Sequence, residues 1–259
     1  MSRPRVIVQT GIYGYGILGR RAEEDLPGTL GAIAAAGFDG LEVMSSLLAE
    51  PDRLARTCTG LGLHVDGVHL FWHELETFDW SVLTTLDTPR LILSGLPVAS
   101  EEAIADNVPQ LREHADRAAK AGARLLIHNH AEEGRPVEGG RIPLEILADR
   151  TRPEELGFVV DLHWAAVAGD TDRIVRATAG RCDYLHIKDG LVDDPEAPHS
   201  FDLGTGEVDL AHGWAAAGAA GAVAVAAVER SMPAEDLDAA LRHDAAYTRG
   251  LIAAGGAGR

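Results

Sequence analysis

One local pattern recurs along the chain and constrains its fold more than any other feature. An alanine-rich stretch ends in glycine, and a short apolar run follows: Ala35–Gly37 precedes Leu41–Val43, and Ala121–Gly122 precedes Arg124–Ile127. Glycine directly after a helix ends that helix at little cost, because it adopts the left-handed conformation readily. Short apolar runs that alternate with helical stretches predict βα units and a parallel sheet.

Eight segments have the length and composition of buried strands. They are Val6–Gln9, Gly40–Met44, Val65–Leu70, Leu91–Ser94, Arg124–Asn129, Phe158–Leu162, Tyr184–Ile187 and Val223–Glu229. Eight βα units within 259 residues indicate an α/β protein with a single (β/α)8 TIM-barrel domain over residues 1–259. Residues 253–259, rich in glycine and alanine, predict a frayed tail.

An open, doubly wound sheet is the alternative fold. Such a sheet usually carries a G-x-G-x-x-G loop after its first strand. The glycine-rich segment 11–16 lacks that spacing, so we interpret it as a flexible loop. The acidic segment 189–199 predicts a long loop after the seventh strand, and loops of that length are usually functional.

The composition excludes several classes of function. With 40 acidic and 23 basic residues the net charge is −17, which disfavours binding to nucleic acid or to an anionic membrane. The two cysteines, Cys58 and Cys182, are too few for a disulfide framework. No long apolar segment follows the basic N-terminus, so we expect no signal peptide, no membrane association and a cytoplasmic location.

Ionisable residues gather at the ends of six of the expected strands. The set comprises Glu42, His69, His128, His130, Glu132, Glu133, Asp161, His163, His186, Lys188, Asp189, Glu229 and Arg230. The carboxyl ends of barrel strands converge on one face, so we expect one shared site. Burying such groups together requires mutual pairing or a cation. Mixed carboxylate and imidazole ligands suit Mn²⁺, Mg²⁺, Co²⁺ or Zn²⁺.

Spacing within the strands adds detail to this site. Residues two apart share a face, so His128 and His130 are expected to point together toward the barrel axis. The same spacing relates Asp161 to His163 and His186 to Lys188. Lys188 either pairs with a carboxylate or binds a substrate oxygen. Two tryptophans near strand ends, Trp72 and Trp164, either stack on a sugar or close the core.

These strand ends resemble the motifs of the xylose-isomerase-like TIM-barrel superfamily, in particular sugar phosphate isomerases/epimerases with an HNHxxE signature. The matching segments, in order along the chain, are Leu126–Glu133 (LIHNHAEE), Gly157–Trp164 (GFVVDLHW), Leu185–Asp189 (LHIKD), Leu203–Asp209 (LGTGEVD) and Val228–Glu229. The resemblance implies one divalent metal ion, with Mn²⁺ favoured, held by Asp161, His186 and Glu229. Many relatives add a glutamate from the fifth strand. Here we predict Glu133 as that fourth ligand, with His128 as the alternative.

The resemblance implies an isomerase or epimerase that acts on a keto- or aldo-sugar through a metal-stabilised enediolate. The predicted catalytic residues are Glu229, Glu133, His130 and Lys188. The predicted substrate-binding residues are His69, His128, His163, Trp164, Glu42 and Arg230. The expected partner is a small-molecule sugar, and a homo-oligomer is compatible with the sequence.

A lyase, dehydratase or glycoside-cleaving enzyme is the alternative function. It would act on a keto-sugar or inosose, remove the same α-proton and then expel a β-leaving group, to which a histidine donates a proton. A carbohydrate-binding barrel without enzymatic activity has no positive support, because binding alone does not need so many titratable strand ends.

Overall fold

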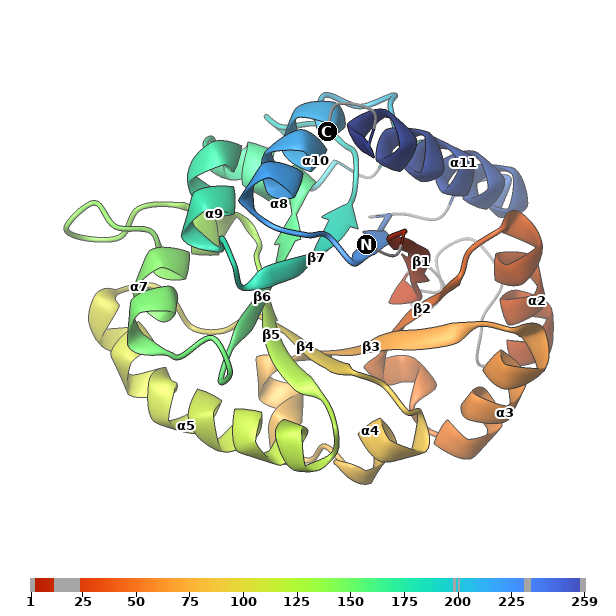
Figure 1. The fold of residues 1–259 in the computed structure, drawn as a ribbon, viewed down its shortest axis with the longest axis horizontal. Coiled ribbons are helices and arrows are strands. Elements are labelled where there is room, and N and C mark those ends of the chain that lie inside the picture. The colour runs from red at the N-terminus through yellow and green to blue at the C-terminus, as the bar shows by residue number, and fades with distance from the viewer. Residues whose placement is uncertain (1–2, 12–23, 198, 200, 231–233, 257–259) are drawn as a thin grey trace.

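The computed structural model describes residues 3–11, 24–197, 199, 201–230 and 234–256. Eight parallel strands follow one another around a closed barrel, and the last strand pairs with the first, which confirms the (β/α)8 fold (Figure 1). The strands are Arg5–Gln9 (β1), Gly40–Met44 (β2), His64–Phe71 (β3), Arg90–Ser94 (β4), Arg124–His128 (β5), Gly157–Asp161 (β6), Cys182–Ile187 (β7) and Val225–Val228 (β8). Every one of the eight expected strands is therefore present.

Helices surround the barrel in the described part of the chain (Figure 1). They are Leu26–Ala36 (α2), Pro51–Leu61 (α3), Ser81–Thr85 (α4), Glu101–Lys120 (α5), Ala131–Gly134 (α6), Pro143–Arg150 (α7), Leu162–Ala168 (α8), Thr171–Ala177 (α9), Leu210–Ala220 (α10) and Leu237–Gly256 (α11), with 3-10 turns at Ser45–Leu47 and Trp72–Glu76. Three of the described helices end at glycines in the left-handed conformation: Gly37 at φ 94°, Gly62 at φ 71° and Gly169 at φ 94°. Among the described residues, none of the helices combines the length and the apolar character that a membrane span requires.

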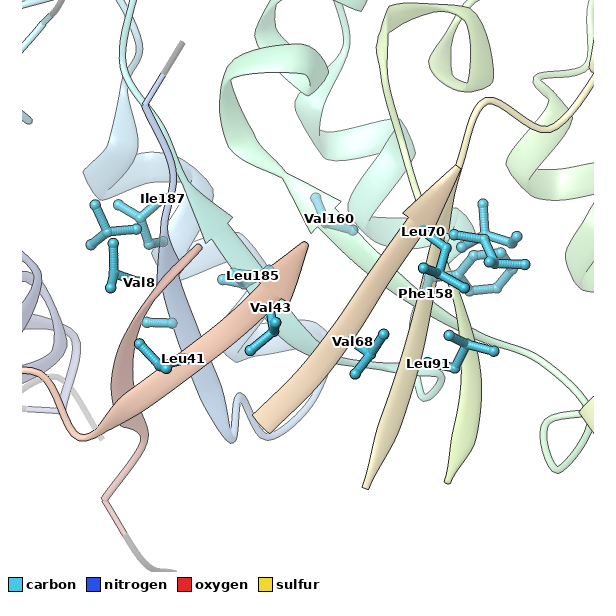
Figure 2. Close-up of a cluster of buried hydrophobic side chains, with 14 of the residues drawn as sticks. Val8, Leu41, Val43, Val68, Leu70, Leu91, Phe158, Val160, Leu185 and Ile187 are labelled. Atoms are coloured by element: carbon cyan, nitrogen blue, oxygen red, sulfur yellow. The ribbon is translucent and has the colours of Figure 1, made fainter. Parts of the chain in front are cut away.

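Alternation along each strand divides the core into two layers. On β1, Ile7 belongs to a small cluster inside the barrel, whereas Val8 belongs to a larger cluster between the strands and the helices. On β4, Ile92 faces inward and Leu91 outward in the same way. Figure 2 shows part of the outer cluster. Because both faces of the sheet are covered, the strands are largely apolar. Most of their polar residues lie toward the ends, and Glu42 and Asp66 are buried exceptions within β2 and β3.

The C-terminal helix is longer than the sequence suggested. We expected a frayed tail from residue 253 onward, but α11 continues to Gly256, and residues 257–259 lie outside the described part. The glycine-rich segment 11–16 also lies outside it, apart from Gly11. The acidic segment after β7 contains no helix or strand among its described residues, as expected for a loop.

A single carboxylate holds the loop that follows β7. Asp189 Oδ2 accepts hydrogen bonds from the backbone N–H groups of Gly204 and Gly206, at 2.8 and 3.0 Å. Its Oδ1 accepts from Gly190 and Val208, at 2.9 and 3.2 Å. A Cβ atom on Gly206 would lie 2.2 Å from Asp189 Oδ1, so this position requires glycine. The loop is thereby fixed against the mouth of the barrel.

Candidate functional site

A cavity of about 400 Å³ opens at the carboxyl ends of the strands. Its lining residues come from the end of almost every strand and from the loops that follow. They are Gln9, Met44, His69, Phe71, Ser94, His128, His130, Glu132, Trp164, Lys188, Glu196, Glu229 and Arg230. This is the face on which (β/α)8 enzymes place their active sites.

Four potential metal ligands from consecutive strands meet at the base of the barrel mouth, and two of them, His128 and Glu229, also line this cavity. His128 ends β5, Asp161 ends β6, His186 lies on β7 and Glu229 directly follows β8. Each offers one ligand atom, and these four atoms lie within 4.8 Å of one another. His128 Nε2 is 3.5 Å from Asp161 Oδ2 and 3.8 Å from Glu229 Oε2. His186 Nδ1 is 2.6 Å from Glu229 Oε2 and 3.9 Å from Asp161 Oδ2.

Two of these atoms are buried and have no hydrogen-bond partner among the described residues. They are His128 Nε2 and Asp161 Oδ2, which face each other. Each such atom costs about 1–3 kcal/mol unless something satisfies it. A cation bound by both nitrogen and oxygen at about 2.1 Å would place its ligand atoms roughly 3 to 3.5 Å apart. The four residues therefore fit a divalent ion, with only small movements required.

The electrostatics of the cluster favour the metal-binding protonation states of Glu229 and His128. Burial would lower the pKa of His186, but the carboxylates of Glu42 and Glu229 outweigh it and raise that pKa to about 10, so an ion would have to displace a proton from this ring. Burial alone would raise the pKa of Glu229, but Lys188 and His186 outweigh it and hold that pKa well below its usual range. Lys188 Nζ donates to Glu229 Oε1 at 2.8 Å. Burial, aided by the nearby His186, lowers the pKa of His128 to about 3. A carboxylate and a neutral imidazole are the forms in which these side chains coordinate metal ions.

Of the two residues considered for the fourth ligand, the alternative His128 belongs to the group of potential metal ligands, whereas the favoured Glu133 does not. Glu133 lies in the short helix α6, where its Oε2 accepts a hydrogen bond from the backbone N–H of His130 at 2.8 Å. The side chain is buried, and burial raises its pKa to about 7. Glu133 is absent from the groups of potential ligands among the described residues. Its spacing from the strand allowed a ligand, but the turn into α6 directs its carboxylate to the backbone.

Glu42 was expected to bind substrate, but it lies beneath the cavity and contacts only protein. Its Oε1 is 2.6 Å from His69 Nδ1, and its Oε2 is 2.8 Å from His186 Nε2. Tyr184 also donates to Oε2 at 2.6 Å. Burial would raise the pKa of Glu42, but the charges and hydrogen bonds of His186 and His69 outweigh it and hold the pKa below its usual range. His69 does line the cavity, and its other nitrogen is 2.7 Å from Ser94 Oγ.

His163 is also absent from the cavity wall. The strand β6 ends at Asp161, and α8 begins at once, so the spacing of two no longer relates these side chains. Asp161 Oδ1 instead caps the new helix by accepting from Trp164 N at 2.9 Å. His163 is buried with its Nε2 3.1 Å from the carbonyl oxygen of Leu191. We had expected His163 to face the barrel axis, and the helix start explains the difference.

Three predicted residues form the wall above the cluster. The ring of His130 lies 5.3 Å from that of Trp164 and 5.0 Å from that of His128, between centroids. Lys188 Nζ lies 5.0 Å from the centroid of Trp164. Of the two tryptophans considered, Trp164 lines the cavity, while Trp72 packs edge-on against His114.

Arg230 lines the cavity with its charge already balanced. Its Nε donates to Asp244 at 2.7 Å and its Nη2 to Asp202 at 2.5 Å. Arg230 therefore joins the loop after β7 to α11 at the rim of the site.

The sequence interpretation omitted three residues that complete the site. Gln9 Nε2 donates to Glu229 Oε2 at 3.1 Å, and Ser94 Oγ lies 3.2 Å from His128 Nδ1. Both are the last residue of an apolar strand, which is the same signal that identified His128 and Asp161. Tyr184 lies two residues before His186 on β7 and so shares its inward face.

Several solved structures share this fold over nearly the whole chain. A sugar phosphate isomerase/epimerase from Parabacteroides distasonis is 19% identical, with 95% of this chain and 96% of that chain covered and a TM-score of 0.76. L-ribulose 3-epimerase is 18% identical, with 97% and 95% covered and a TM-score of 0.76. The IOLI protein, described with a binding zinc atom, is 18% identical, with 96% and 98% covered and a TM-score of 0.74. No protein-family model and no curated protein matches the sequence.

Proposed function

We propose that this chain is a divalent-metal-dependent isomerase or epimerase that acts on a keto- or aldo-sugar. The observation that carries the proposal is the group His128, Asp161, His186 and Glu229 at the base of the barrel mouth, with two buried ligand atoms that lack hydrogen-bond partners among the described residues. The structural neighbours support the same class of reaction, because those proteins bear the names of sugar isomerases and epimerases.

The proposed ligand set contains two imidazole nitrogens and two carboxylate oxygens. Such a set suits Mn²⁺, Co²⁺ or Zn²⁺ better than Mg²⁺, which prefers oxygen ligands. We retain Mn²⁺ as the expected ion. When bound, the ion would polarise a substrate carbonyl and so make the proton on the adjacent carbon easier to remove.

Proton transfer would then fall to side chains of the cavity wall. Glu229 is the proposed base, since Oε2 belongs to the ligand group while Oε1 is held by Lys188. Lys188 can leave Oε1 to donate to the substrate oxygen on which negative charge develops, and this move frees Oε1 to accept the proton. His130 is the proposed second proton carrier. Burial lowers its pKa, so the imidazole is neutral near pH 7 and can both accept and donate.

The charges around the cavity favour a sugar without a phosphate group. Among the described lining residues, the cations Lys188 and Arg230 are each paired with carboxylates. The exposed rim adds Glu132 and Glu196. An anionic substrate would meet this acidic rim unfavourably.

A lyase or glycoside-cleaving enzyme is the second candidate, and one feature of the cavity supports it. The predicted opposite base Glu133 is turned to the backbone, which leaves His130 on the wall in its place. A histidine is a good proton donor to a leaving group near neutral pH. Both reactions begin with removal of the same α-proton.

Solvent exchange tests the proposed function and separates the two candidates. The metal-loaded protein is incubated in D₂O with a panel of unphosphorylated keto-sugars and their glycosides. Deuterium incorporated into an intact carbon skeleton supports an isomerase or epimerase, whereas loss of a hydroxyl group or aglycone supports a lyase. Glu229→Gln should lower the exchange rate by about 10²-fold or more while substrate affinity changes little. Glu154→Gln, a change in an exposed ion pair with Arg152, is the control. Unchanged exchange in Glu229→Gln would refute its role as the base.

A further inference from the structure

We propose that Glu42 is a positioning residue, which decides which nitrogen of each proposed metal-binding histidine keeps its proton when an ion is bound. Glu42 contacts His186 but does not line the cavity. The inference rests on the proposed metal site and concerns the buried residues beneath it. Two hydrogen-bonded paths leave the carboxylate of Glu42, one to His186 and one to His128.

The path to His186 is direct. A carboxylate only accepts hydrogen bonds, so the contact of 2.8 Å between Glu42 Oε2 and His186 Nε2 requires the proton to be on Nε2. His186 Nδ1 faces the ligand group and lies 2.6 Å from Glu229 Oε2, so without an ion it also carries a proton. An ion in the ligand group would replace the proton on Nδ1, and Glu42 would keep the proton on Nε2. A second residue that fixes the tautomer in this way is a common feature of histidine ligands.

The path to His128 passes through two further side chains. Glu42 Oε1 accepts from His69 Nδ1, which places the proton of a neutral His69 on that atom. His69 Nε2 must then accept from Ser94 Oγ, 2.7 Å away. Because the Ser94 hydroxyl donates its one proton to His69, its oxygen accepts a hydrogen bond from His128 Nδ1, at 3.2 Å. His128 Nε2 is left with a lone pair, directed at Asp161.

A charge balance supports neutral histidines in this network once a divalent ion is bound. The buried carboxylates Glu42 and Asp161 and the largely buried Glu229 carry three negative charges, and Lys188 carries one positive charge. A divalent cation in the ligand group makes the buried site neutral when all three histidines are uncharged. Buried sites that lack a net charge avoid a large desolvation cost.

The consequence of reversing these hydrogen bonds shows why their direction matters. Were His69 protonated at Nε2 instead, it would donate to Ser94, and Ser94 would donate to His128 Nδ1. The proton of His128 would then lie on Nε2, where it would block the metal. Glu42→Gln allows this reversal, because a glutamine amide offers one acceptor and one donor, whereas both carboxylate oxygens of Glu42 accept hydrogen bonds.

The test is long-range ¹H–¹⁵N correlation NMR of the full-length protein with ¹⁵N-labelled histidine, with Zn²⁺ as a diamagnetic probe. In the wild type we expect His128 to bind zinc through Nε2 with its proton on Nδ1, and His186 to show the opposite pattern. Glu42→Gln should weaken zinc binding about 10- to 100-fold. In the metal-free protein it should shift the proton of His128 from Nδ1 to Nε2, or remove the proton from His186 Nε2. Tyr184→Phe is the matched control. It removes one donor to the same carboxylate but leaves the direction of both paths intact, so the tautomers should not change.

The outcomes separate the network from the metal site. A wild-type protein that binds no zinc would overturn the metal site and this inference together. Zinc bound through His128 Nδ1, or Glu42→Gln with wild-type affinity and tautomers, would overturn the inference alone. If Glu42→Gln does not fold, Ser94→Ala cuts the path to His128 only. It should weaken zinc binding and leave His128 as a mixture of tautomers, while His186 keeps its proton on Nε2; unchanged His128 signals would contradict the proposal.

Discussion

The substitution Asp161→Asn should stabilise the protein without metal and remove most of the stabilisation that bound metal provides. Asp161 Oδ1 caps α8 through Trp164 N, and asparagine caps helices about as well as aspartate. The amide nitrogen would take the place of Oδ2, 3.5 Å from His128 Nε2. If that nitrogen carries a lone pair, the new N–H group donates to it, and two buried atoms without partners become satisfied.

The size of each effect follows from these contacts. Satisfying the pair should add about 1–3 kcal/mol to the stability of the metal-free protein. Metal at 100 times its dissociation constant stabilises the wild type by about 2.7 kcal/mol, and a 100-fold loss of affinity reduces this to about 0.4 kcal/mol. For a chain of this size each kcal/mol corresponds to about 2–4 °C in Tm. The metal-induced rise in Tm should therefore fall from about 5–10 °C to about 1 °C.

The assay is thermal unfolding of chelator-treated protein with and without Mn²⁺ or Zn²⁺, alongside direct titration of the metal. Asp170→Asn is the matched control, because Asp170 caps α9 in the same way, through Arg173 N, at an exposed position. It should leave the metal-induced rise in Tm unchanged. The reasoning is refuted if Asp161→Asn lowers the Tm of the metal-free protein, or if the variant binds one equivalent of metal as tightly as the wild type.

Three other predictions concern residues around the cluster. The raised pKa of Glu133, about 7, means that its contribution to stability is complete below about pH 4.5 and is lost as the pH rises through 7. Glu133→Gln should remove about 3 kcal/mol of this pH-dependent loss of stability. Urea unfolding at pH 5 and pH 8 measures the difference, with the exposed Glu132→Gln as control. His130→Asn should lower turnover by about 10²- to 10⁴-fold in an isomerase. In a lyase the same change should spare exchange of the α-proton and stop loss of the leaving group, so wild-type turnover would exclude both roles. Asp189→Ala should destabilise the protein by about 3 kcal/mol in urea unfolding, because four backbone amides lose a charged acceptor, and faster hydrogen exchange at Gly204 should accompany it.

Most of the fold could be predicted from the sequence because the barrel imposes a repeated local pattern. Most strand residues are apolar on both faces, and glycine ends several of the preceding helices, so the eight strands stand out without knowledge of tertiary contacts. The boundaries were less certain where an element ends in a polar residue. The sequence predicts Leu162 as part of a strand, but the carboxylate of Asp161 caps α8, and this helix begins at Leu162.

The site was less predictable because strand spacing says nothing about where the chain turns. His128 and His130 lie two apart, and both line the cavity as expected. Asp161 and His163 lie two apart as well, yet a helix begins between them and His163 points to the carbonyl of Leu191. Glu133 is misleading in the same manner, since its carboxylate is engaged with the backbone of its own short helix.

The imidazole at the end of β5 explains why the residues beneath the site are so extensively hydrogen-bonded. An ionised carboxylate ligand presents lone pairs from either oxygen and carries no proton, so no neighbouring residue has to fix the place of a proton on it. An imidazole has one lone pair when neutral, and a proton on the wrong nitrogen removes it. His128 therefore depends on an acceptor at Nδ1, and Ser94 can act as one only while it donates to His69. That second bond in turn requires Glu42, the same carboxylate that orients His186. The proposed ligands on β5 and β7 and their supports on β2, β3 and β4 thus form one hydrogen-bonded unit around the buried carboxylate of Glu42.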